Sequence, residues 1–244
     1  MTTSAQFVTG GVAECTFHPV DVEDNFSVPG LYAFHAAHSP NHPVFAYADP
    51  QTKELHDITY ATAWRDIRRF ASVVSSQWTS AGYATNVQGA QKRQVIGILA
   101  LSDTLSYIYL MIAIMSLGHA VFPMSTRNTP LVTAHLLEKV GVTHVFINED
   151  SAMRKLAEEA NNLLVKKGLQ SAQIAQMISV VDSKINTFTE ALETGINEIA
   201  DNEVTVILHS SGKASLRCPR QRSNISVLQA VLDTQSLSLS PGAD

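Results

Sequence analysis

The residues best suited to chemistry stand near the end of the chain, where an apolar run leads into small polar residues. The run Val206-Ile-Leu208 has the composition of a buried strand, and His209, Ser210, Ser211 and Gly212 follow it directly. Small residues after a parallel strand let several backbone N–H groups converge on an anion, and serine hydroxyls add donors. The pattern therefore predicts the start of a phosphate-binding loop. By themselves, these residues are better explained by an ordinary Ser-Gly turn, because such turns are common.

Lys213 suggests a second interpretation, the nucleotide-triphosphate loop in which glycine and lysine precede a hydroxyl residue. That loop requires a glycine five positions before Gly212 and a serine or threonine directly after the lysine. Ile207 and Ala214 stand at these two positions. The sequence therefore excludes this type of loop.

Three histidines, His35, His38 and His42, lie close together and could be drawn as metal ligands. Pro40 and Pro43 break any helix that would align them, and no cysteine or acidic residue joins the group. We therefore expect capping and turn roles for these histidines and predict no metal site.

The remaining candidates for proton transfer also have simpler explanations. Asp103 precedes a helical run and is expected to cap it rather than act as a general base. Structural roles are expected for the isolated His119, His135 and His144. The sequence thus predicts no catalytic residue.

Length and composition are typical of a globular protein that lies in the cytoplasm. The chain has 244 residues, 45% of them hydrophobic, and a formal net charge of −5, which argues against a general nucleic-acid binder. Cys15 and Cys218 are too few for a disulfide framework or a zinc site, so we expect a reducing setting. The first residues lack a secretory signal, and the apolar run 105–117 is too short to cross a bilayer. We therefore expect no membrane contact.

Before Gly212 the chain alternates between helical and strand-like runs. Three- and four-residue steps predict one amphipathic helix, ending at Gly82, with a buried face made of Trp64, Ile67, Ala71, Val74 and Trp78. Further helices are expected at 104–117, 130–140 and 151–167, and strands at 95–101, 120–124, 143–147, 178–181 and 204–209. Such alternation is typical of βαβ units, so the predicted fold class is α/β, with a mostly parallel sheet flanked by helices.

The composition changes near Gly212. From Lys213 onward there are four basic and two acidic residues and no aromatic residue, whereas the preceding part carries the acidic excess. A packed domain normally uses aromatic residues as core anchors, so we expect residues 213–244 to form a disordered tail. Four basic residues without aromatic neighbours make a poor nucleic-acid site.

Several short motifs occur together and in an order that is more specific than any one of them. They are Phe34-His-Ala36, Ser39-Pro-Asn-His-Pro43, Ile58-Thr-Tyr60, Gly97-Ile-Leu99, Leu117-Gly118, Phe122-Pro-Met-Ser-Thr-Arg-Asn128, His135-Leu-Leu137 and Ile207-Leu-His-Ser-Ser-Gly212. With these motifs the chain resembles the N-terminal part of an adenylation domain of the adenylate-forming (AMP-binding) superfamily. It is most similar to fungal NRPS-like carboxylate reductases, the relatives of aminoadipate reductase. The resemblance implies an N-terminal extension at 1–29, a truncated adenylation domain at 30–212 and a divergent tail at 213–244.

The resemblance also implies an activity. Enzymes of this superfamily use ATP and Mg to convert a carboxylic acid into an acyl-adenylate, and then pass the acyl group to a thiol. In the NRPS-like enzymes of secondary metabolism that thiol is often a phosphopantetheine on a downstream carrier domain, and reduction can follow. The resemblance assigns His209, Ser210, Ser211 and Gly212 to the loop that holds the ATP phosphates.

Two later positions of that loop depart from the superfamily pattern. Ser215 stands where a second glycine is expected, and Cys218 stands where the lysine is expected. Serine lacks the backbone freedom of glycine, and cysteine cannot supply a fixed positive charge. We therefore expect an inactive fragment of an adenylate-forming enzyme.

Two alternatives stay open. The chain could be a non-catalytic remnant or interaction protein with an adenylation-like fold, or a small module that retains affinity for nucleotides. In each case the buried strands predict an apolar surface or sheet edge left uncovered, and hence self-association.

Overall fold

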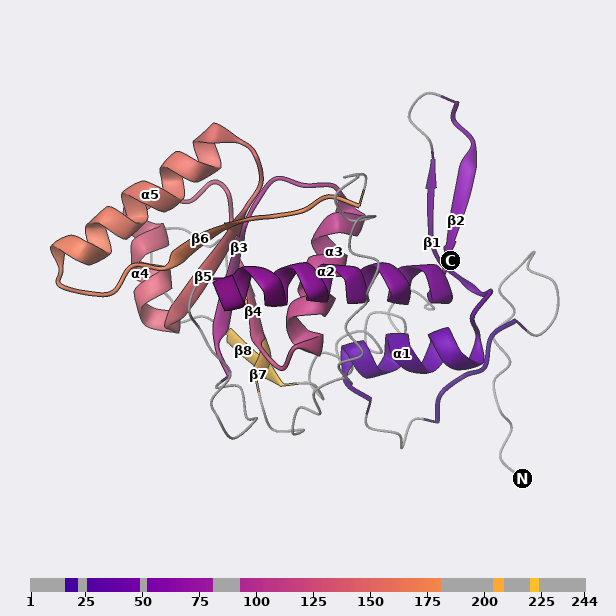
Figure 1. Ribbon diagram of the computed structural model, residues 1–244. Coiled ribbons are helices and arrows are strands. Elements are labelled where there is room, and N and C mark those ends of the chain that lie inside the picture. Colours follow the sequence, from indigo (N-terminus) through magenta and orange to yellow (C-terminus); the bar gives the residue numbers. More distant parts are fainter. Residues whose placement is uncertain are drawn as a thin grey trace, which may run out of the picture.

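The computed structural model describes residues 16–21, 26–48, 52–80, 93–180, 204–208 and 220–223, with only the backbone at 78–80 and 220–223 (Figure 1). Its centre is a six-stranded sheet in the order β6-β5-β3-β4-β7-β8. The strands are β3 (Val95–Leu99), β4 (Ala120–Pro123), β5 (Val142–Ile147), β6 (Gln173–Gln176), β7 (Val204–Leu208) and β8 (Arg220–Ser223). All neighbours pair in parallel except β7 and β8, which are antiparallel. The predicted α/β class with a mostly parallel sheet is confirmed.

Helices cover both faces of this sheet (Figure 1). On one face, α2 (Tyr60–Ser80) and α3 (Thr104–Ser116) pack against Ile96, Ile98 and Val121, and α1 (Val28–His38) packs beside these two helices. On the other face, α4 (Pro130–Val140) and α5 (Ser151–Lys166) pack against Phe122, Val145 and Ile147. Successive strand residues thus alternate between two separate cores, as expected for a sheet buried on both faces.

The helices begin and end where local side-chain chemistry predicts. Asp103 Oδ1 accepts a hydrogen bond from Ser106 N at 2.8 Å, which confirms the expected cap of α3. Thr129 caps α4, whose first residue is Pro130, and Gly141 ends it with a positive φ of 70°. On α2, Ile67, Ala71 and Val74 are buried as predicted, whereas the Trp78 side chain and Gly82 lie outside the described residues.

Two strand predictions need correction. The run 95–101 ends as a strand at Leu99, and Leu101 is 57% exposed beyond the sheet edge. The edge strand β6 lies at 173–176 rather than 178–181. Contacts with α3 explain this difference. Ser106 Oγ, in the first turn of α3, accepts a hydrogen bond from Val180 N at 2.9 Å and lies 3.4 Å from Ser179 Oγ. These contacts hold residues 179 and 180 against the start of α3 instead of in the sheet.

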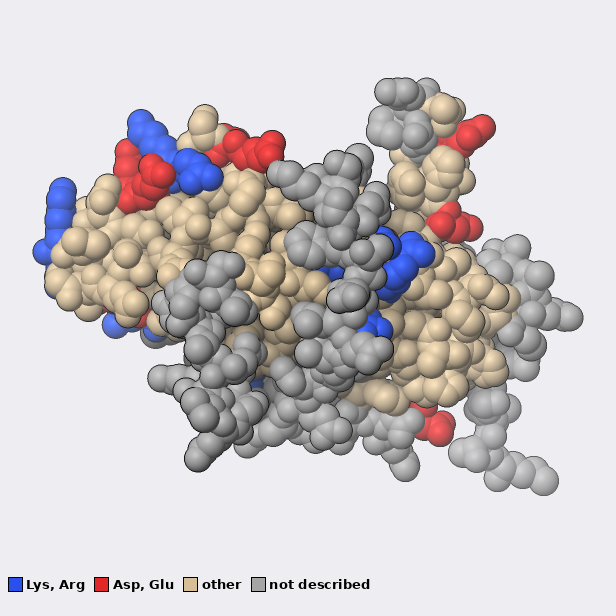
Figure 2. Space-filling model, in the orientation of Figure 1, with Lys and Arg blue, Asp and Glu red and all other residues tan. Residues whose placement is uncertain are grey.

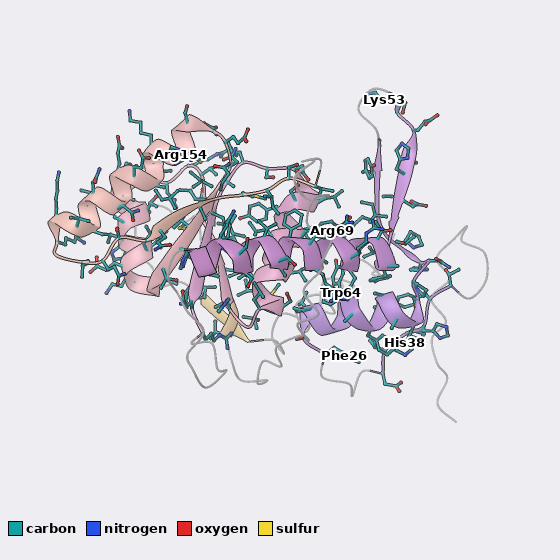
Figure 3. All side chains as sticks on the ribbon, in the orientation of Figure 1. Phe26, His38, Lys53, Trp64, Arg69 and Arg154 are labelled. Carbon is teal, nitrogen blue, oxygen red and sulfur yellow. The ribbon has the colours of Figure 1, made fainter. Side chains whose placement is uncertain are left out.

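One helix and one hairpin were not predicted. The helix α1 is capped by Ser27, has proline at its second position and is apolar on several sides, so it shows no periodic stripe. The strands β1 (Pro43–Ala48) and β2 (Leu55–Thr59) form an antiparallel hairpin that projects from the body, with Lys53 at its tip (Figure 3). Most of its residues are exposed, so it lacks the apolar alternation that signals a strand against a core.

The short strand β8 lies inside the segment for which we expect a disordered tail. Its four residues pair with β7 and so differ from that expectation, while the rest of 213–244 lies outside the described residues. The domain boundaries at 29 and 212 stay predictions. No described helix is long and apolar enough to cross a membrane.

Candidate functional site

The strand that leads into the predicted phosphate loop lies inside the sheet. β7 is hydrogen-bonded to β4 on one side, with Val121 opposite Val206, and to β8 on the other. Val206 is buried in the core beneath α2 and α3, and Ile207 is buried in the core beneath α4 and α5. These contacts fix the direction in which the chain leaves β7 at Leu208, toward the edge formed by the carboxyl ends of the parallel strands.

The predicted site residues themselves, His209, Ser210, Ser211 and Gly212, lie outside the described residues. So do the two departures from the loop pattern, Ser215 and Cys218. Their assignment to a phosphate loop therefore stays a prediction. Around them, the structure fixes the two ends of the connection, because Leu208 pairs with Arg220 across β7 and β8. Leu208 and Arg220, the described residues on either side of 209–219, thus lie at one edge of the sheet, next to the carboxyl end of β4.

Polar residues follow the other parallel strands at this edge, and the backbone uses several of them locally. Asn148 Oδ1 accepts a hydrogen bond from Leu101 N at 3.4 Å, and Ser125 Oγ accepts one from Arg127 N at 3.3 Å. Asp103 is engaged as the cap of α3. The Arg127 side chain is exposed after β4, the neighbour of β7. Arg127 is a polar residue of this edge without an assigned role in the predicted site, and its position just after a strand is the signal that could have marked it.

The first histidine group forms an aromatic cluster. The His35 ring is 2% exposed and stacks on Phe17 with centroids 4.7 Å apart, and it also lies 4.7 Å from Tyr60. His42 Nδ1 lies 2.8 Å from Thr16 Oγ1 in the turn after α1, whose last residue is His38 (Figure 3). Burial lowers the pKa of His35, and His42 and His38 lower it further. Among the described residues, no three histidine, cysteine or acidic side chains are arranged to hold a metal ion.

Two further histidines lie at the opposite edge of the sheet, where the strands begin. His119 and His144 are 2% and 4% exposed, in keeping with the expected structural roles. Burial, followed by His144 and Arg93, lowers the pKa of His119 to about 4. The His144 pKa is also lowered by burial. Both rings are therefore neutral at pH 7.

The charged residues of α5 are surface features. Glu158, Glu159, Lys166 and Lys167 are exposed, and Figure 2 shows charges of both signs over this helix. Lys167 Nζ lies 2.8 Å from Glu138 Oε2 on α4. Such exposed pairs stabilise a fold only slightly, and they suggest no site.

Comparison with solved structures defines the class of fold. The luciferase-like enzyme of the mealworm Zophobas morio superposes with a TM-score of 0.63 at 19% identity, over 90% of this chain and 47% of that one. A fatty acyl CoA synthetase of Mycobacterium tuberculosis superposes with a TM-score of 0.59 at 18% identity, over 86% of this chain and 37% of that one. The N-terminal subdomain of Klebsiella oxytoca NpsA was solved in complex with 3-hydroxyanthranilyl-AMSN. It superposes with a TM-score of 0.54 at 13% identity, over 81% of this chain and 40% of that one. The fold is that of the N-terminal part of adenylate-forming enzymes.

Sequence comparison finds proteins that are similar to this chain and that are also adenylate-forming by name. The adenylate-forming reductase Nps10 of Heterobasidion annosum is 27% identical over 203 residues, which are 80% of this chain and 18% of the relative. Nps11 of Serpula lacrymans var. lacrymans (strain S7.9) is 24% identical over 81% of this chain and 17% of its own length. No model of a protein family matches the sequence. The chain is thus similar in sequence to adenylate-forming reductases, and it spans less than a fifth of their length.

Proposed function

We propose that the chain is the N-terminal part of an enzyme that activates a carboxylic acid with ATP and Mg to form an acyl-adenylate. The acyl group would then pass to a phosphopantetheine thiol on a carrier domain, with reduction to follow. The observation that carries this proposal is the position of β7, which lies between β4 and β8 in the sheet. β7 ends at Leu208, directly before His209 in the sequence, at the edge where the parallel strands end. The similarity to adenylate-forming reductases supports it.

The residues present fit one part of the proposed ATP site. Ser210, Ser211 and Gly212 offer two hydroxyls and a residue that permits close backbone approach to phosphate oxygens. Ser215 and Cys218 do not supply the second glycine and the fixed charge of the superfamily pattern. We therefore propose that the 244-residue chain binds nucleotide weakly and does not catalyse the formation of an acyl-adenylate. By itself the chain would be a non-catalytic remnant. Residues 30–212 would form the adenylation part, flanked by 1–29 and 213–244, in a cytoplasmic protein.

Two measurements on the purified chain test these statements. Calorimetric titration with ATP is expected to show millimolar binding that falls about thirtyfold when Ser210 and Ser211 are both changed to alanine, since each lost donor removes about 1 kcal/mol. Ser171→Ala, at an exposed serine far from this loop in the sequence, is the matched control. Absence of heat at millimolar ATP, or unchanged affinity in the double variant, would contradict the proposed phosphate loop.

Carboxylate-dependent exchange of labelled pyrophosphate into ATP separates the two functional alternatives. We expect no exchange above background from this chain. Exchange that requires an added carboxylic acid would show that the chain is a working enzyme despite Ser215 and Cys218.

A further inference from the structure

A polar network connects the starts of five strands at the edge of the sheet away from the predicted loop. Gln94, just before β3, is its hub: its backbone N–H points to His119 Nδ1 at 3.4 Å, and its carbonyl accepts a hydrogen bond from Ala120 N at 2.9 Å. The Gln94 side-chain oxygen accepts a hydrogen bond from Thr143 Oγ1 at 2.7 Å. The network therefore holds the beginnings of β3, β4 and β5 together through a single residue.

Arg93 extends the same network to β7. Its guanidinium donates a hydrogen bond to the carbonyl oxygen of Val204, the first residue of β7. Because Arg93 and Gln94 are consecutive, a movement of Gln94 displaces the residue that ties β7 to the sheet. Along the parallel neighbour β4, the register of β7 is set by one residue pair, Val121 and Val206, so this tie matters for the start of the strand.

The hydrogen bond at His119 requires a neutral ring. Nδ1 can accept from Gln94 N–H only when it carries no proton. A proton at Nδ1 would place two donors face to face and a positive charge in a site that is 2% exposed. The titratable groups that act electrostatically on this ring are His144 on β5 and Arg93 before β3, and His144 in turn has a side-chain hydrogen bond with Gln173 on β6. Arg93 is itself cationic, so the two charges would repel each other.

We propose that His119, Gln94 and Arg93 form a proton-sensitive clamp that holds the start of β7 in the sheet. With His119 neutral, Gln94 stays in place and Arg93 reaches the Val204 carbonyl. Protonation of His119 breaks its contact with Gln94, repels Arg93 and releases the start of β7. The device thus links acidity to the attachment of the strand that leads into the predicted phosphate loop, whether or not that loop binds ATP.

The sign of the effect follows from the pKa of His119, which is about 4 in the folded chain against 6.5 for an ordinary histidine. Between these two pH values an opened state binds a proton that the closed state does not. The clamp is therefore fully closed above pH 6.5 and weakens as the pH falls toward 4. An opening that restores the ordinary pKa becomes about thirtyfold more favourable at pH 5 than at pH 7.5.

Hydrogen exchange of backbone amides in the full chain, corrected for the intrinsic pH dependence of exchange, tests this clamp. We expect the protection of residues 204–208 to fall about ten- to thirtyfold from pH 7.5 to pH 5. The protection of β5 is expected to change far less. In His119→Asn, whose side-chain oxygen can replace Nδ1 as acceptor and does not titrate, residues 204–208 should keep their protection at both pH values. His56→Gln, at an exposed histidine on the hairpin, should behave as the unmodified chain.

A second variant keeps the test independent of how well His119→Asn folds. Arg93→Met removes the tie to Val204, so residues 204–208 should lose protection already at pH 7.5. Equal loss of protection over β5 and β7, or a pH dependence that persists in His119→Asn, would overturn the proposal. Unchanged protection in Arg93→Met would overturn it as well.

Discussion

At the scale of single residues, the core contains a hydroxyl with no described hydrogen-bond partner. Tyr109 on α3 is fully buried, its ring lies 5.9 Å from that of Phe70, and its oxygen accepts and donates no hydrogen bond within the described part of the chain. Burial, and then the charge of Asp66, raise the pKa of this hydroxyl, so it is neutral at any ordinary pH. A buried polar atom without a partner lowers stability.

Tyr109→Phe is therefore expected to leave the free energy of unfolding unchanged or to raise it by up to about 1 kcal/mol. Urea unfolding followed by circular dichroism measures this change. Tyr107→Phe, on the same helix but only partly buried, is the matched control and should stay within about 0.5 kcal/mol. A loss of more than 1 kcal/mol on removal of the Tyr109 hydroxyl would reveal a hydrogen bond that this interpretation denies, on the scale expected for such bonds.

At the scale of elements, the open edge of the sheet is partly closed by side chains. Asn161 on α5 binds both backbone groups of Ala172, just before β6: its Nδ2 donates to Ala172 O at 2.7 Å, and its Oδ1 accepts from Ala172 N at 3.0 Å. Gln77 Nε2 on α2 similarly donates to the carbonyl of Gln176 at 3.3 Å. These amides occupy positions that a further strand would otherwise fill, and native proteins protect sheet edges in comparable ways.

Asn161→Ala is expected to lower the free energy of unfolding by about 2 kcal/mol, because the two backbone groups of the buried Ala172 lose their partners. The neighbouring Asn162→Ala, at an exposed position on the same helix, should change it by less than about 0.5 kcal/mol. Chemical denaturation of both variants measures the difference. Equal effects of the two substitutions would show that the Asn161 contacts contribute nothing specific.

The elements also show what the sequence could predict. The segment from Val95 to Gly168 combines apolar runs with caps such as Asp103, Thr129 and Gly141, so local chemistry fixes each boundary to within a residue or two. α1 and the β1–β2 hairpin lack such periodicity. The strand expected at 178–181 is prevented by contacts of Ser106, which is distant in sequence. The order of the strands depends likewise on long-range contacts, which a pattern of local residues does not encode.

The candidate site likewise combines features that local sequence predicts with features that depend on long-range contacts. The loop residues Ser210, Ser211 and Gly212 could be selected from their types alone, since small and hydroxyl residues after a strand suit phosphate. The placement of β7 beside β4, which brings Arg127 to the same edge, follows only from the sheet. The clamp of Gln94, Arg93 and His119 could not be foreseen either, because its members precede two different strands, β3 and β4, and contact the start of a third, β7.

At the scale of the whole molecule, exposed leucines gather at the edge where the parallel strands end. Leu101 follows β3, Leu131 lies in the first turn of α4 after β4, and Leu208 ends β7, with exposed fractions of 57%, 66% and 45%. The carboxyl ends of parallel strands share one edge of a sheet, so these side chains belong to the same part of the surface. Large apolar side chains gathered in this way typically mark a contact surface.

We therefore expect the chain to self-associate through this edge, so that its average mass in sedimentation equilibrium exceeds 26.5 kDa and rises with concentration. Combining Leu101→Glu with Leu131→Glu should return the mass toward that of the monomer, because each buried leucine contributes about 2 kcal/mol to a contact and a glutamate cannot be buried unpaired. The matched control is Val165→Glu, near the end of α5, since Val165 is 58% exposed and equally apolar but lies at the opposite edge. A chain that is monomeric at every concentration, or a Val165→Glu variant that dissociates as completely as the double variant, would show that this edge does not mediate association.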